Sequence, residues 1–125
     1  MSTSTRGLLI GVAMLATLTA CGGVSELTRQ QVARSETAVR QAETAVGNSE
    51  AGALELQQAR DTYAEAKKQL DAKNETRAQR LAVQAELQAQ LATAKTQNAQ
   101  ARRAADELLA SIQTLRQETE RSSNR

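Results

Sequence analysis

The chain has 125 residues, which suits one small domain, and it carries 16 Lys and Arg residues against 14 Asp and Glu. It contains no His, Trp, Phe or Pro, and only one Cys and one Tyr. This balance leaves no basic patch for nucleic acid, and the lack of His removes the commonest catalytic base and metal ligand. The composition therefore argues against a nucleic-acid-binding protein, a metalloprotein or an enzyme. It points to no cofactor and no small-molecule substrate.

The first 20 residues have the zones of a secretory signal peptide. Residues 1–6 are polar and include one basic residue, residues 7–18 are apolar, and Thr19 and Ala20 are small. The apolar zone is shorter than the roughly 20 residues that a membrane-spanning helix needs. We therefore expect this segment to be removed from the mature chain rather than to span the membrane.

Cys21, the only cysteine, follows this segment directly. Together with Leu18, Thr19 and Ala20 it resembles the lipobox of bacterial lipoproteins, in which Leu and two small residues precede an obligatory Cys. The resemblance implies cleavage after Ala20, attachment of a diacylglycerol to the Cys21 sulfur, and acylation of the new amine. Two or more acyl chains anchor a protein stably, because each buried methylene contributes about 0.8 kcal/mol. The alternative is a free thiol, which is a liability in an oxidising compartment.

The residue after the cysteine bears on the choice of membrane. In enterobacterial lipoproteins an Asp at this position resembles a signal for retention in the inner membrane, whereas this chain has Gly22. The resemblance therefore implies export to the periplasmic face of the outer membrane. The inner membrane remains the alternative, since other bacteria use other retention residues.

The mature chain, residues 21–125, is rich in helix-forming residues and poor in large apolar ones. It has 21 Ala but only ten Leu, five Val and one Ile. Small side chains let helices approach closely, but they do not build a thick globular core. We expect an all-α fold, either an antiparallel helical hairpin or a three-helix bundle, with one long, coiled-coil-like C-terminal helix.

Turn and capping residues divide the mature chain. Ser25 suits the N-cap of a first helix, Gly47 and Asn48 suit its end, and Asn74 marks a weaker interruption before the last helix. A helix continuous through 71–75 is the alternative at that point. The expected segments are a lipidated tether over 21–25, a helical domain over 26–121 with helices over 26–46, 53–72 and 75–121, and a frayed tail over 122–125.

The last helix carries a long stripe of residues with alternating spacings of three and four, as in a coiled coil. The stripe consists of Gln84, Leu87, Leu91, Ala94, Asn98, Ala101, Ala105, Leu108, Ile112 and Leu115. Its large apolar members are expected to be buried, with Leu87 and Leu91 covered by the second helix, while Gln88, Gln97 and Gln113 face water. At about 70 Å, this helix is longer than the others, so its C-terminal half should project or pair with another chain.

Polar and charged residues on the helices offer only weak candidate sites. Gln84 and Asn98 on the stripe either fix the register of a helix pair or leave it loose enough for water. Tyr63 fits a core position better than a site. The pairs Lys67–Lys68, Arg102–Arg103 and Asp106–Glu107 fit solvated helix surface better than a contact with an anionic partner or a catalytic carboxylate pair. The sequence therefore predicts no catalytic, cofactor-binding or metal site.

Two segments resemble an uncharacterised family of short, alanine-rich bacterial lipoproteins that carry the domain of unknown function numbered 4398. The segments are LELQQAR at 54–60 and RAQRLAVQA at 77–85, within a resemblance over 35–107. The second segment is also similar to half of a helical hairpin repeat, which implies repeat-like packing. The family has no assigned activity, so no catalytic residue is implied.

These observations predict a non-enzymatic lipoprotein of the cell envelope that faces the periplasm. The membrane contact would be made through acyl chains on Cys21. The helices would act as a spacer or a protein-interaction module, by self-association or with an envelope protein. The alternative is a lipid-anchored accessory factor that regulates an enzyme of the cell wall.

Overall fold

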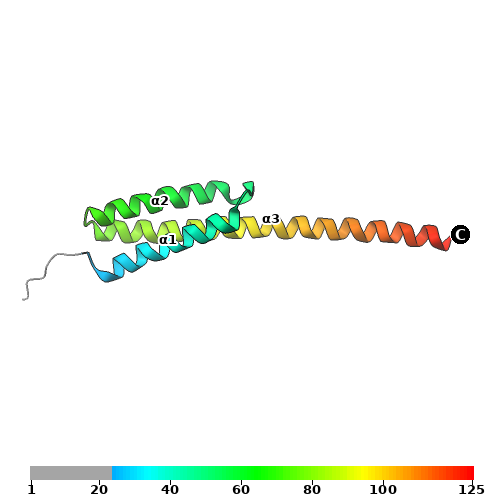
Figure 1. Ribbon diagram of the computed structural model, residues 1–125, viewed down its shortest axis with the longest axis horizontal. Coiled ribbons are helices and arrows are strands. Elements are labelled where there is room, and N and C mark those ends of the chain that lie inside the picture. The colour runs from blue at the N-terminus through cyan, green and yellow to red at the C-terminus, as the bar shows by residue number, and fades with distance from the viewer. Residues whose placement is uncertain (1–23) are drawn as a thin grey trace, which may run out of the picture.

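The computed structural model describes residues 24–125, which form three α-helices and a short 3-10 helix (Figure 1). The elements are α1 (Glu26–Val46), η1 (Glu50–Gly52), α2 (Ala53–Asp71) and α3 (Glu75–Ser123). The helices α1 and α2 pack along the N-terminal half of α3, and the rest of α3 extends beyond them. The expected all-α fold is confirmed, as a three-helix bundle with a long C-terminal helix.

Local signals set both ends of α1. The Ser25 hydroxyl accepts a hydrogen bond from the Thr28 N–H at 3.4 Å, which satisfies one of the free donors at the helix start. At the other end Gly47 has φ 50° and ψ −118°, and the Ser49 N–H donates to the Val46 carbonyl at 2.8 Å. These are the features of a type II′ turn, which favours glycine at its first central position. The break expected after residue 46 is confirmed.

The chain reverses between α2 and α3 in a tight turn. Lys73 has a positive φ of 61°, and its N–H donates to the Leu70 carbonyl at 2.9 Å. The Asn74 N–H donates to the Gln69 carbonyl at 2.9 Å. This pair of bonds is a Schellman motif, which ends a helix by satisfying its last carbonyls. The alternative of one helix continuous through 71–75 is therefore wrong.

Alanine dominates the core of the bundle. Eight alanines are almost completely buried: Ala42, Ala59, Ala66, Ala78, Ala82, Ala85, Ala89 and Ala92. The larger buried apolar residues are Val32, Val39, Val46 and Leu56. Gly52 marks a very close approach between η1 and α3, since a Cβ there would contact the Ala92 carbonyl oxygen and lie 2.6 Å from the Thr96 hydroxyl oxygen. The small residues thus let the helices pack with little space between their backbones.

The helices α1 and α3 run in the same direction, and α2 runs antiparallel to both (Figure 1). Their buried positions follow the same spacing: Thr28, Val32, Ser35, Val39, Ala42 and Val46 in α1, and Ala78, Ala82, Ala85, Ala89, Ala92 and Thr96 in α3. Two bonds fix their relative position: the Ser25 N–H donates to Glu75 Oε1 at 2.6 Å, and Gln31 Nε2 donates to Glu86 Oε2 at 2.9 Å. The two helices therefore present equivalent faces to the bundle.

Candidate interaction surface

The helix α3 has apolar residues on two opposite sides. Its inner side is the row of buried small residues from Ala78 to Thr96. Seven large apolar residues of α3 are instead 41–65% exposed: Val83, Leu87, Leu91, Leu108, Leu109, Ile112 and Leu115. At about 3.6 residues per turn, Leu87 lies nearly half a turn around the helix from Ala85 and Ala89. We call this exposed apolar side of α3, from Val83 to Leu115, the outer strip.

The prediction that the second helix covers Leu87 and Leu91 is wrong, whereas Leu108, Ile112 and Leu115 lie on the part of α3 that was expected to project. Leu87 and Leu91 are 59% and 48% exposed, although the sequence predicts that α2 covers them. Gln88, expected to face water, is half-buried instead. The cause is that α3 turns its alanine row toward α1 and α2, which places the equally regular leucine row on the opposite side. Gln84 and Asn98, which share the outer strip, are exposed as well.

The C-terminal half of α3 projects from the bundle, as the sequence predicts (Figure 1). Every residue from 100 to 125 is exposed. At the rise of an α-helix, the segment 100–123 is about 36 Å long. Near its end, Ile112, Leu115 and Thr119 line a shallow, mainly apolar depression. Most helical stability in proteins comes from packing of an apolar face, and on this segment the apolar residues Leu108, Ile112 and Leu115 are exposed.

Tyr63 joins α2 to α1 at the core, as expected of a core residue rather than a site. It is half-buried and packs against both apolar clusters of the bundle. Burial and a hydrogen bond with Glu36 raise the pKa of Tyr63 to about 12. The same hydrogen bond lowers the pKa of the Glu36 carboxyl. The pair therefore links the two helices most strongly when the phenol is neutral and the carboxyl is ionised.

This pKa leads to a first prediction. Tyr63 is the only aromatic residue, so ultraviolet absorbance follows its ionisation without interference. We expect a midpoint near pH 12 in the folded chain and near pH 10 in urea. The folded state favours the neutral phenol. The free energy of unfolding should therefore not vary with pH through this group below pH ~10, and it should fall as the pH rises from there toward 12. Glu36→Gln should lower the folded midpoint in part, since burial remains. A folded midpoint equal to that in urea would contradict the prediction.

Ion pairs hold α2 against its neighbours. Glu55, in the first turn of α2, is mostly buried and pairs with Lys95 of α3. A hydrogen bond from Lys95 lowers the pKa of the Glu55 carboxyl. Arg60 of α2 contacts Glu43 of α1, with 2.7 Å between Nε and Oε1. The Glu55–Lys95 pair favours the rotation of α3 seen in the bundle, whereas the Arg60–Glu43 pair joins α2 to α1.

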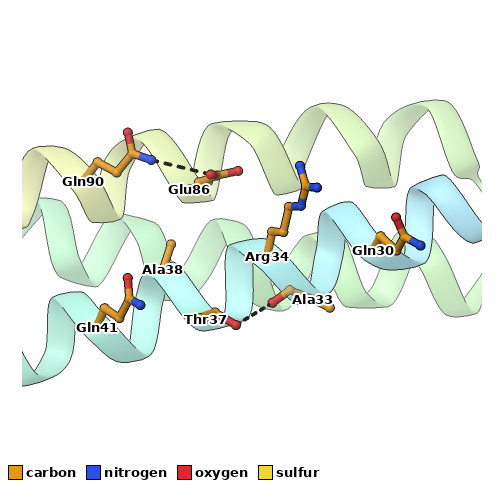
Figure 2. Close-up of a pocket in the computed structure, with 8 residues that line it drawn as sticks. All are labelled: Gln30, Ala33, Arg34, Thr37, Ala38, Gln41, Glu86 and Gln90. Atoms are coloured by element: carbon orange, nitrogen blue, oxygen red, sulfur yellow. Dashed lines mark hydrogen bonds between the residues drawn. The ribbon is translucent and has the colours of Figure 1, made fainter.

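A shallow groove of about 520 Å³ lies between α1 and α3 and is lined by two alanines and six polar or charged residues (Figure 2). Its lining consists of Gln30, Ala33, Arg34, Thr37, Ala38, Gln41, Glu86 and Gln90. Gln90 donates to Glu86 at 3.5 Å, and the Thr37 hydroxyl donates to the Ala33 carbonyl at 3.1 Å (Figure 2). These eight residues include no pairing of a nucleophile with a general base. The groove thus offers ordinary helix-surface contacts.

Within residues 24–125, the remaining candidate residues are not brought together into a site. The cleavage and lipid-attachment residues Ala20 and Cys21 lie outside the residues that the structure describes. The charged pairs at 67–68, 102–103 and 106–107 are exposed on helix surfaces. Among residues 24–125, no group of three or more His, Cys, Asp or Glu side chains is placed to hold a metal ion. Over the same residues, no helix combines the length and the apolar character needed to cross a membrane.

The bundle and the outer strip define a small all-α protein whose long last helix has an exposed apolar side. A model of the family described as Domain of unknown function (DUF4398) matches residues 30–108, and the chain belongs to this family. The matched segment covers most of α1, all of α2 and the part of α3 up to Leu108. No curated protein and no solved structure has significant similarity to the chain.

Proposed function

We propose that this protein is a non-enzymatic lipoprotein of the bacterial cell envelope. It is anchored at the periplasmic face of the outer membrane through acyl chains on Cys21. In this position it acts as a helical spacer that carries a protein-interaction surface. The lipobox-like residues from Leu18 to Cys21 support the anchor, and the exposed outer strip supports the interaction role.

The observation that carries this proposal is the position of the two ends of the described chain (Figure 1). The helix α1 begins at the end of the molecule where α3 also begins, and the Ser25–Glu75 bond ties these two helix starts together. The C-terminus lies at the opposite end. The 49 residues of α3 span about 74 Å at the rise of an α-helix. An anchor before α1 would therefore hold the bundle at the membrane and the projecting segment away from it.

A second candidate function is regulation of a cell-wall enzyme by a lipid-anchored accessory factor. The projecting end of α3, with its apolar depression around Ile112 and Leu115, favours this alternative because an amphipathic helix can bind in a groove of a partner. Cross-linking of intact envelopes followed by purification separates the two functions. A recovered cell-wall enzyme supports the accessory factor, whereas cell-wall material or a second copy of the chain supports the spacer and interaction module.

Substitution of Cys21 tests the anchor. Intact-mass analysis of the wild type should find a chain that starts at Cys21 and carries acyl mass, and Cys21→Ala should abolish this mass. The variant should be soluble or retain its leader, because sulfur attachment precedes cleavage in the lipoprotein mechanism that the lipobox resemblance implies. Thr19→Ser, which keeps a small residue in the lipobox, is the matched control and should be acylated normally. A mature N-terminus elsewhere without acyl mass would refute the anchor.

A further inference from the structure

We propose that the outer strip of α3 binds a second copy of this chain, so that two α3 helices form a parallel, in-register coiled coil. The inference rests on the proposed function in one respect, since it names the partner of the interaction module. It does not require the lipid anchor. Four features of α3 support it: the heptad pattern, the extent of the strip, the place of Asn98 and the charges on either side.

The outer strip follows a heptad pattern through the exposed side of α3. The a positions are Gln84, Leu91, Asn98, Ala105 and Ile112, and the d positions are Leu87, Ala94, Ala101, Leu108 and Leu115. All ten residues are exposed in the single chain. Sustained a/d patterning over at least three or four heptads is typical of coiled coils, and here it continues for about five. The heptad pattern therefore runs without a break from Gln84 to Leu115, and its a and d residues are exposed in the single chain.

The extent of the strip matches a stable interface. The a, d, e and g positions between Val83 and Arg116 number about 20 on each copy, at the lower end of the roughly 20–30 residues a side of standard interfaces, and two of them, Gln88 and Lys95, are partly taken up by the bundle. Along α3 these positions cover about 50 Å. The helices α1 and α2 contact the opposite side of α3, where the buried residues Ala78 to Thr96 lie. A second α3 can therefore lie along the whole strip.

Asn98 favours an identical, in-register partner. It occupies an a position, where an asparagine is known to fix both register and the number of helices in a coiled coil. Its amide has donors and an acceptor that need partners once the strip is covered. In a parallel pair the amide of one Asn98 meets the amide of the other at the same height. A purely apolar surface, such as a lipid layer, would leave the donors and the acceptor of the Asn98 amide without hydrogen bonds.

The charges beside the strip favour the parallel orientation. On one flank, the e positions include the cations Arg102 and Arg116, and also Lys95, which already pairs with Glu55 of α2. On the other flank, the g positions Gln90, Gln97, Ala104 and Ser111 are uncharged. In a parallel coiled coil each e position faces a g position of the partner five residues earlier, so Arg102 and Arg116 face the uncharged Gln97 and Ser111. In an antiparallel pair the e positions face one another, and cation would meet cation.

Single-cysteine cross-linking of the full chain in cells tests the proposal. We would introduce Ala94→Cys and Leu115→Cys separately and treat intact cells with a short bismaleimide. Both variants should give an adduct of twice the mass in high yield, because each residue meets its own copy in a parallel pair. The two positions are about 31 Å apart on the helix. An antiparallel pair can bring only one of them next to its own copy, so a dimer at one position alone would overturn the proposal.

Two controls complete the test. Ala110→Cys lies in the same projecting segment but off the strip, and it should give at least tenfold less dimer. Leu108→Gln combined with Ile112→Gln should reduce the adduct at Ala94→Cys by at least tenfold, while circular dichroism of the purified variant shows that the helices persist. Equal yields at all three cysteines, adducts only with another protein, or no adduct would each overturn the proposal.

Cross-linking of the unsubstituted chain, in which Cys21 is the only cysteine, separates the test of the dimer from the test of the lipid anchor. An acylated Cys21 has no free thiol, so the unsubstituted chain should give no adduct. A cross-linked product in the unsubstituted chain would show a free Cys21 and count against the lipid anchor. The engineered positions would then be compared in a Cys21→Ser background, where the dimer proposal stands or falls on its own.

Discussion

Gly52→Ala is expected to lower the free energy of unfolding by about 3 kcal/mol, at the upper end of overpacking effects. The new methyl group would collide with the carbonyl oxygen of Ala92, which belongs to the backbone of α3 and cannot rotate away. It would also lie 2.6 Å from the Thr96 hydroxyl oxygen. Relief of both contacts requires η1 to move away from α3. Such a loss is a large share of the roughly 5–15 kcal/mol that stabilises a small domain.

A double mutant separates the two contacts at Gly52. Thr96→Ala removes a side chain whose buried hydroxyl has no hydrogen-bond partner, so alone it should change stability by less than ~1 kcal/mol. Combined with Gly52→Ala, it should recover only part of the loss, because the backbone collision remains. Urea denaturation of the four chains measures the coupling between the two sites. Full recovery in the double mutant, or a stable Gly52→Ala variant, would contradict the close approach of η1 to α3 at Gly52.

Ala89→Leu is the second substitution with a large expected effect. Ala89 is 1% exposed and lies in the apolar cluster that contains Val39, Leu56 and Ala59. Three additional carbon atoms cannot be placed there without separating the helices, and we expect a loss of about 3 kcal/mol. For a domain of this size, the loss corresponds to a fall of roughly 12–24 °C in Tm.

Ala110→Leu is the matched control for Ala89→Leu. It makes the same change in the same helix, on the exposed projecting segment and off the outer strip. Its effect should be within about 0.5 kcal/mol, as for most surface substitutions. Thermal unfolding followed by circular dichroism compares the two variants directly. Similar Tm values for both would mean that the alanine core is loosely packed.

The helices were predictable because their signals are local. Ser25, Gly47 and Asn74 act through capping and turn geometry that involves only nearby residues in the chain. The α1 bounds agree with the prediction, α2 ends one residue earlier, and α3 ends two residues later. The long projecting end also followed from sequence, because helix length is fixed by residue count.

The side of α3 that faces the bundle was not predictable in the same way. Two rows with alternating spacings of three and four run along this helix, one of alanines and one that includes five large aliphatic residues. Hydrophobicity alone favours the leucine row as the core. The bundle instead uses the alanine row, because only small side chains allow the close packing seen at Gly52. The alanines at 78, 82, 85, 89 and 92 were the available signal, and their regular spacing could have raised this possibility.

Contacts between residues far apart in the chain could not be predicted from the sequence either. Glu55 and Lys95 are 40 residues apart, and nothing in their local sequence distinguishes them from other charged residues on helix surfaces. Their pairing becomes evident only when α2 is placed against α3. The regular spacing of the outer-strip residues is visible in the sequence. Their exposure follows only once α1 and α2 are placed against the alanine row of α3.

The parallel course of α1 and α3 determines how the molecule would respond to mechanical load. The chain enters α1 at one end of the bundle and leaves α3 at the other (Figure 1). Tension between these ends would pull α1 and α3 past each other along their axes. The contacts from Ser25–Glu75 to Gln31–Glu86 and the buried rows would then be strained together in shear, rather than separated one after another as in a hairpin opened from its loose ends. The order of the three helices thus suits a protein that must keep its shape when its two ends are pulled apart.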